Sequence, residues 1–129
     1  MGIKKYIANK DNTITNAFGI DLSTRATGSN MGAADILEVF SIYGSQTTSS
    51  AELSRVLIEF PVSSIISDRS AGIIPVSGSV NFYLRVFNAR HSEQLPENFT
   101  VNVMAVSQSW QEGSGLDMET YEDKTKENI

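Results

Sequence analysis

Cysteine is absent from the 129 residues, which excludes disulfide bonds, thiolate metal ligands and cysteine nucleophiles. Histidine occurs once, as His91. A Ser–His–Asp arrangement needs a nucleophile and an orienting carboxylate beside the histidine, and zinc sites use several His or Cys ligands. We therefore expect His91 to be an exposed loop residue. We also expect no enzyme active site, no cofactor and no bound metal.

Dense runs of basic or apolar residues are also missing. The 10 basic and 15 acidic side chains give a formal net charge of -5, and the lysines and arginines are scattered. Nucleic-acid binding needs clustered cations, so we expect none. No stretch approaches the roughly 20 apolar residues of a membrane span. Lys4 and Lys5 are not followed by the apolar stretch of a signal peptide. We expect a protein that stays soluble in a cytoplasm or assembles there, without a membrane partner.

Three segments do show the alternation of apolar and polar residues that is typical of half-buried strands. They are residues 52–60, 79–88 and 99–106. The alternation ends near Val106, where we expect a bulge or bend. A fourth segment, 36–43, is apolar with few interruptions and predicts a strand buried on both faces.

Shorter signals complete the pattern. Residues 4–8 and 13–17 are weaker strand candidates, and residues 61–66 could form one helical turn, because proline fits the first helical position. Small polar loops lie at 28–32, 44–50, 67–72 and 75–78. Many short strands without a long helix favour an all-β fold, here a jelly-roll-like antiparallel β-sandwich with a short acidic C-terminal tail.

The same pattern divides the chain into three parts. Residues 1–32 are expected to form N-terminal strands or a docking arm, residues 33–111 the β-sandwich core, and residues 112–129 an acidic C-terminal segment. The length suits a single domain core. The residues expected in its interior are Val56, Ile58, Phe60, Val80, Phe82, Leu84, Val101, Val103 and Trp110.

Three carboxylates in the C-terminal part, Glu112, Asp117 and Glu119, allow three interpretations. A glycosidase pair needs a fixed separation of roughly 5–10 Å and one raised pKa, and nothing in the sequence imposes either. Oxygen ligands could hold calcium, but the spacing does not match an EF-hand loop. A solvated acidic face is the interpretation we favour. Gly113-Ser114-Gly115 is too short for a phosphate loop and predicts a turn.

Three aromatic residues are the candidate contact residues. Trp110 follows the last predicted strand, where it could be a buried core residue or a platform on which a sugar stacks. Tyr83 and Phe87 point away from the predicted core face. They could belong to an interface and so indicate oligomerisation.

The order of these features resembles the DNRLRE-type β-sandwich family, which is related to jelly-roll carbohydrate-binding modules. The resemblance rests on ILEV at 36–39, RVLIEFPVSSI at 55–65, the strand at 79–86 and VNVMAVSQSWQEG at 101–113. It covers about residues 33–113. The motif that names the family is missing here, so no binding site carries over from it.

The whole chain also resembles virion structural proteins of T4-like marine phages (cyanophages), through NMGAADILEVF at 30–40 and SQSWQEGSGLDME at 107–119. Related sandwiches continue into further strands beyond Ile129. This sequence is therefore either a fragment of a longer protein or a chain whose sheet edge a partner completes by strand addition.

These resemblances imply a phage virion structural protein that is assembled in the host cytoplasm and acts through protein–protein contacts. Its position could be tail, neck, fibre base or capsid surface. Its partners would be other virion proteins and further copies of itself. The alternative is a carbohydrate-binding module that recognises a host surface glycan, which needs exposed Trp110 and Tyr83 on one concave face. A hydrolase is the third and weakest alternative.

Overall fold

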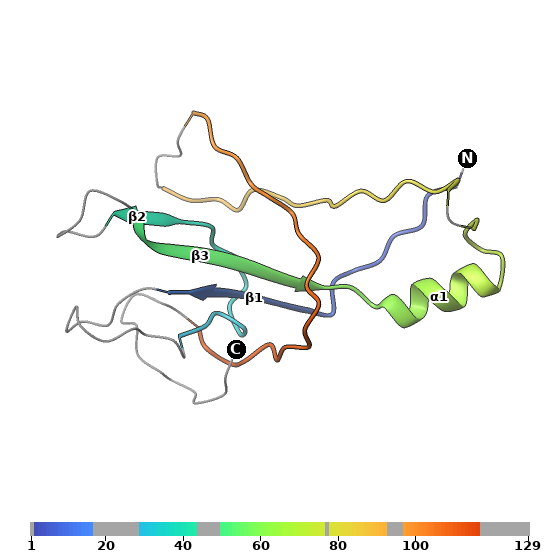
Figure 1. The fold of residues 1–129 in the computed structure, drawn as a ribbon, viewed down its shortest axis with the longest axis horizontal. Helices are drawn as coiled ribbons and strands as arrows, with labels where there is room; N and C mark the ends of the chain where they lie inside the picture. Colours follow the sequence, from blue (N-terminus) through green and yellow to red (C-terminus); the bar gives the residue numbers. More distant parts are fainter. Residues whose placement is uncertain (1, 17–28, 44–49, 77, 93–96, 117–129) are drawn as a thin grey trace.

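The computed structural model describes residues 2–16, 29–43, 50–76, 78–92 and 97–116. Three strands in this part of the chain form one antiparallel sheet, and a single helix follows it. The strands are β1 (Lys10–Thr15), β2 (Ser41–Tyr43) and β3 (Ser50–Glu59), and the helix is α1 (Val62–Ser70). Their order in the sheet is β1–β3–β2, so β3 lies in the centre (Figure 1).

The central strand β3 is the element that the sequence predicted best. Its alternating pattern predicted a strand over 52–60, and the observed strand begins two residues earlier and ends one residue earlier. β1 pairs with it in an unbroken register from Lys10 opposite Glu59 to Thr15 opposite Ser54. The pairing of β2 is shorter and shifts register between Ile42 and Tyr43. The weak strand expected at 13–17 therefore exists, but it begins at Lys10. Residues 4–8 form no strand.

The helix α1 is longer than the single turn expected at 61–66. It runs to Ser70, and Pro61 is its N-cap residue rather than its first helical residue. Residues 67–70, expected in a loop, are therefore helical. The helix closes with the Ala71 amide donating to the Ser67 carbonyl and the Gly72 amide to the Arg69 carbonyl. Gly72 has φ +72°, a conformation that glycine adopts without a Cβ penalty at a helix end.

The predicted jelly-roll β-sandwich is wrong. Residues 79–88 and 99–106, which the alternating pattern assigned to two strands, are extended in the structure but pair with no neighbouring strand, so no bulge of a strand exists near Val106. Within the described ranges there is one sheet and no second sheet packs on it. Alternation shows that a segment can be half-buried in a sheet, but it does not supply the partner strand.

The interior is correspondingly polar. Met31 and Ile74 are the buried apolar residues of the described part, whereas Asn12, Thr13, Ser29 and Asn30 are buried polar residues. Of the strand expected at 36–43, the end exists as β2 (Ser41–Tyr43), whereas residues 36–40 form no strand and expose Ile36 and Val39, so the expectation of burial on both faces is wrong for 36–40. Of the nine residues expected in the interior, five are half-buried: Val56, Ile58, Phe60, Val80 and Trp110. The other four are exposed: Phe82, Leu84, Val101 and Val103.

Candidate functional site

Asn12 on β1 connects three distant segments. Its side chain is fully buried. The amide oxygen accepts a hydrogen bond from the Met31 backbone N–H at 2.9 Å, and the amide nitrogen donates to the Glu112 carbonyl at 2.6 Å. A buried amide must have partners for both of its polar atoms, and here each partner comes from a different part of the chain. Asn12 therefore fixes where residues 31 and 112 lie relative to the sheet.

Asn30 makes a similar connection between its own segment and residues 113–115. Its side-chain oxygen accepts from the Gly115 backbone N–H at 2.9 Å and from the Gly32 backbone N–H at 3.2 Å. The Ala33 N–H donates to the Gly115 carbonyl at 2.9 Å. We call the contact of Asn12, Asn30, Gly32, Glu112 and Gly115 the polar node. Its members come from the first and the last of the three parts into which the sequence pattern divided the chain, and the Ala33 N–H links the start of the middle part to it.

The glycines of the polar node allow the backbones to approach closely. A Cβ on Gly32 would overlap the Glu112 carbonyl, and a Cβ on Gly115 would overlap the Asn30 carbonyl. Gly113 has φ +79° and faces the Asn30 side chain. Only residues without a Cβ fit at these contacts. The segment 113–115, expected to be a turn, thus contributes tight packing in the polar node.

Glu112 is half-buried and does not belong to the solvated acidic face that we expected for it. Its carboxylate accepts the Asp11 backbone N–H at 2.9 Å. Beside it, the Met31 N–H donates to the Thr13 carbonyl, and Ile14 forms a bridge with Asn30. These contacts cover the outer edge of β1, and covered edges do not template further strands. Asp117 and Glu119 lie outside the described residues.

The groups that could carry catalysis or hold a metal are dispersed. His91 is exposed, as the sequence predicted. In the ranges that the structure describes, no three His, Asp or Glu side chains gather as a metal site. No helix among these residues has the length and apolar character to cross a membrane. The printed contacts of the Asn12 and Asn30 side chains in the polar node are to backbone groups.

A second polar cluster holds the N-terminal segment against α1. The Tyr6 hydroxyl donates to the Asp68 carboxylate at 2.6 Å, and the Lys4 ammonium lies 3.1 Å from the same oxygen. The hydrogen bond to Asp68 raises the pKa of Tyr6 to about 12, with burial adding to the shift. The hydrogen bonds from Tyr6 and Lys4 lower the pKa of Asp68. Asp68 is therefore ionised at neutral pH and accepts from both donors.

The candidate contact residues Tyr83 and Phe87 lie on an extended segment outside the sheet. Tyr83 is 86% exposed and Phe87 is 78% exposed. The Arg85 guanidinium lies 4.8 Å from the centroid of the Phe87 ring, which covers part of that ring. Both rings therefore lie at the surface.

Trp110 has a different environment. It is half-buried, and the Lys10 ammonium of β1 lies 5.8 Å from the centroid of its ring. A cation at this distance from an aromatic ring is attracted to its face. The structure thus places Trp110 beside the sheet, with neither the full burial of a core residue nor the open face of a sugar platform.

Two extended segments carry many of the exposed large apolar residues of the described part. We call them arm A (residues 78–92) and arm B (residues 97–109), and Figure 1 shows both as long traces outside the sheet. Beyond Ser79, the described backbone of neither arm makes a hydrogen bond. Their exposed apolar residues are Phe82, Tyr83, Leu84, Val86 and Phe87 in arm A and Phe99, Val101, Val103, Met104 and Val106 in arm B.

Both faces of arm A are exposed. Of the inward set of the predicted strand, Val80 is half-buried, but Phe82, Leu84 and Val86 are exposed together with the outward residue Tyr83. Unpaired backbone groups next to apolar side chains on both faces are a surface that another chain can cover by strand addition. The sequence analysis missed this because it assigned the inward set to a core.

The polar node was also missed. Asn12, Asn30 and Gly115 are far apart in the sequence, and no local signal predicts that they meet. The one available hint was that the two segments with phage-protein resemblance, 30–40 and 107–119, each contain a member of the node.

Comparisons of the chain with family models, with curated proteins and with solved structures found no match. The two resemblances noted in the sequence therefore stay predictions.

Proposed function

We propose that this chain is a structural subunit of a phage virion that acts through protein–protein assembly. It is assembled in the host cytoplasm and its arms dock on neighbouring subunits of the tail, neck, fibre base or capsid surface. The resemblance of residues 30–40 and 107–119 to phage virion proteins is the reason for proposing a virus particle.

The observation that carries the assembly role is the exposure of both arms. Soluble monomers rarely expose contiguous apolar patches larger than a few hundred Å², and larger patches mark interaction sites. Here the arms expose ten large apolar side chains, while the buried apolar residues of the described part are Met31 and Ile74. Association would bury apolar surface worth roughly 25 cal/mol per Å². Assembly would therefore bury the apolar side chains of the arms that the sheet and α1 do not cover.

The glycan-binding alternative stays a prediction with less support. It needs Trp110 and Tyr83 as exposed rings on one surface. Tyr83 is exposed, but Trp110 is half-buried with the Lys10 ammonium over its ring. A sugar that stacked on this ring would have to compete with that cation.

Purified particles of a virus that carries this gene provide the test. We expect quantitative mass spectrometry to find the chain in a fixed, repeated copy number per particle, and antibodies against it to label one location by electron microscopy. Particles in which the gene has been deleted are the matched control. A chain that is absent from washed wild-type particles, although it is present in the infected cell, contradicts the proposal.

A further inference from the structure

The arms carry opposite charges. Arm A contains Arg85 and Arg90 and no acidic residue, whereas arm B contains Glu97 and no basic residue. Two extended segments that are both apolar, unpaired and opposite in charge match one another as partners in an antiparallel sheet. Arm A therefore supplies the positive charges of such a pair, and arm B supplies the negative charge.

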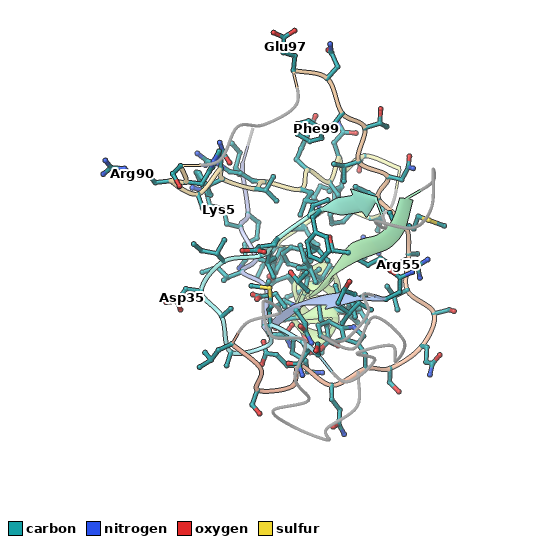
Figure 2. All side chains as sticks on the ribbon, turned by 90° about the vertical axis from the view of Figure 1, so that its left-hand side faces the viewer. Lys5, Asp35, Arg55, Arg90, Glu97 and Phe99 are labelled. Carbon is teal, nitrogen blue, oxygen red and sulfur yellow. The ribbon has the colours of Figure 1, made fainter. Side chains whose placement is uncertain are left out.

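Within one chain the charged ends of the arms do not meet. Figure 2 shows Arg90 and Glu97 on separate projections that point away from the sheet. Neither residue takes part in the ion pairs of the described residues, which join Lys4 to Asp68 and Lys10 to Glu59. The arms of a single chain thus leave their complementary charges apart.

We infer that a second copy of this chain covers the arms, with arm A of each copy paired to arm B of the other. The inference rests on the proposed assembly function and names its partner. A reciprocal pairing uses every arm once and closes with two-fold symmetry. The product is a dimer of fixed size rather than an open fibre.

The apolar area of the arms is sufficient for such a dimer. The rings of Phe82, Tyr83, Phe87 and Phe99 are 64%, 86%, 78% and 67% exposed. At about 150–250 Å² for each aromatic side chain, they expose on the order of 600 Å². Exposed aliphatic residues of the two arms and Met104 add to this area; the aliphatic residues are Leu84, Val86, Val101, Val103 and Val106. A stable interface buries about 800 Å² per partner.

Because the chain has no cysteine, single-cysteine variants report the pairing without background. Tyr83→Cys in arm A and Val103→Cys in arm B replace exposed residues. The two variants are mixed, one of them with an affinity tag, and treated with a short bismaleimide. We expect a covalent pair that contains one copy of each variant. The matched control is tagged and untagged Tyr83→Cys alone, in which the two cysteines lie on different edges of the dimer.

Three results would overturn the inference. The first is a mixed sample in which only uncrosslinked monomers are found. The second is a covalent dimer in the Tyr83→Cys control that forms as readily as in the mixed sample. The third is a crosslink within one chain in the double variant Tyr83→Cys/Val103→Cys at high dilution. The last result means that the arms form an intramolecular hairpin.

Light scattering across a dilution series gives a second test. We expect a mass of twice the 14.1 kDa chain for the unmodified protein. Val103→Asp should raise the dissociation constant by a factor of about ten or more, because an ionised carboxylate would lose its water against an apolar surface. Ile3→Asp makes the same kind of change at an exposed residue outside the arms and should leave the mass unchanged. A monomer at all concentrations contradicts the dimer, whereas the virion test above then still decides the assembly role.

Discussion

Single residues of the polar node connect three segments of the chain: β1, residues 30–33 and residues 112–115. Asn12 satisfies backbone groups from two other segments, and Asn30 satisfies one in its own segment, at Gly32, and one in a distant segment, at Gly115. Leaving a buried donor or acceptor without its partner costs about 1–3 kcal/mol per group. The position of the 111–116 segment against β1 therefore depends on a few amide side chains and on glycines that allow the approach.

Gly32→Ala tests this close approach. The new Cβ would overlap the Glu112 carbonyl, so the two backbones must move apart and strain the node. We expect a loss of about 1–3 kcal/mol in the free energy of unfolding, the usual cost of overpacking. Urea denaturation followed by the fluorescence of the single tryptophan, Trp110, measures it.

Gly2→Ala is the control for this substitution, because no atom lies within 4 Å of a Cβ at that position. It should leave the denaturation midpoint unchanged. Equal midpoints for Gly32→Ala and the unmodified chain would mean that the contact between Gly32 and Glu112 is absent in solution.

The cluster of Tyr6, Asp68 and Lys4 makes docking of the N-terminal segment depend on pH. The pKa of Asp68 is lowered in the folded chain, so its stabilising contribution is present above its ordinary pKa and is lost as the pH falls through the folded value. The pKa of Tyr6 is raised from 10.0 to about 12, so its contribution is present below pH 10 and is lost as the pH rises toward 12. Docking is therefore expected to hold between these two limits.

Asp68→Asn tests the cause of the tyrosine shift. Replacing the carboxylate with an amide removes the negative charge and leaves a weaker, neutral acceptor in place of the charged one that raises the pKa of Tyr6, while the Arg69 charge that lowers it remains. We expect the pKa to fall from about 12 back toward 10, as measured by NMR titration of the Tyr6 ring carbons. Glu59→Gln, which removes a carboxylate that pairs with Lys10, should leave the Tyr6 titration unchanged. An unchanged pKa in Asp68→Asn would contradict the assignment of the shift to the charged Asp68 acceptor.

At the scale of elements, β3 organises the sheet because both of its edges are paired. The outer edge of β1 is covered by residues 30–31 and by Glu112, so the sheet does not extend on that side. The helix α1 contains no buried residue. Its link to the N-terminal segment is the contact of Asp68 with Tyr6 and Lys4.

Ser54 on β3 fixes the segment that leads into β2. Its hydroxyl accepts the Phe40 N–H at 2.6 Å and donates to the Glu38 carbonyl at 3.1 Å. We expect Ser54→Ala to cost about 0.5–1.5 kcal/mol, the net value of such a hydrogen bond, and to speed exchange of the Phe40 amide. Hydrogen exchange measured by NMR checks both.

Ser63→Ala on α1 is the matched control for Ser54, since Ser63 is an exposed serine. It should leave Phe40 exchange unchanged. Equal Phe40 exchange in Ser54→Ala and in the unmodified chain would show that the hydroxyl does not hold the segment.

For the whole molecule, the contrast between sheet and arms predicts two classes of amide protons. In the dilute chain we expect the paired amides of β1 and β3 to be protected and the amides of 80–92 and 97–109 to exchange nearly freely, because their backbones have no partners. Raising the protein concentration should protect the arms and leave the sheet unchanged. Strong protection of the arms at the highest dilution would show that they pair within one chain.

The sequence could predict those features that depend on near neighbours. The alternation at 52–60 identified β3, and the proline at position 61 placed the start of a helix within one residue. The same rules assigned strands to 79–88 and 99–106, where the structure has extended chain without a ladder. Tyr83 and Phe87, assigned to the outer face, are exposed, but so are Phe82 and Leu84, which were assigned to the core, so the alternation did not separate two faces here.

Backbone preference is local, and so composition and periodicity determined that these segments are extended, that α1 follows β3, and that thiol chemistry is excluded. Pairing is not local, because a strand needs a partner whose position depends on loop closure and on the rest of the fold. Only the tertiary structure therefore decided that Asn12 and Asn30 join residues 31–33 to 112–115. It also decided that the two arms remain unpaired, and this turns residues expected in a core into a surface for association.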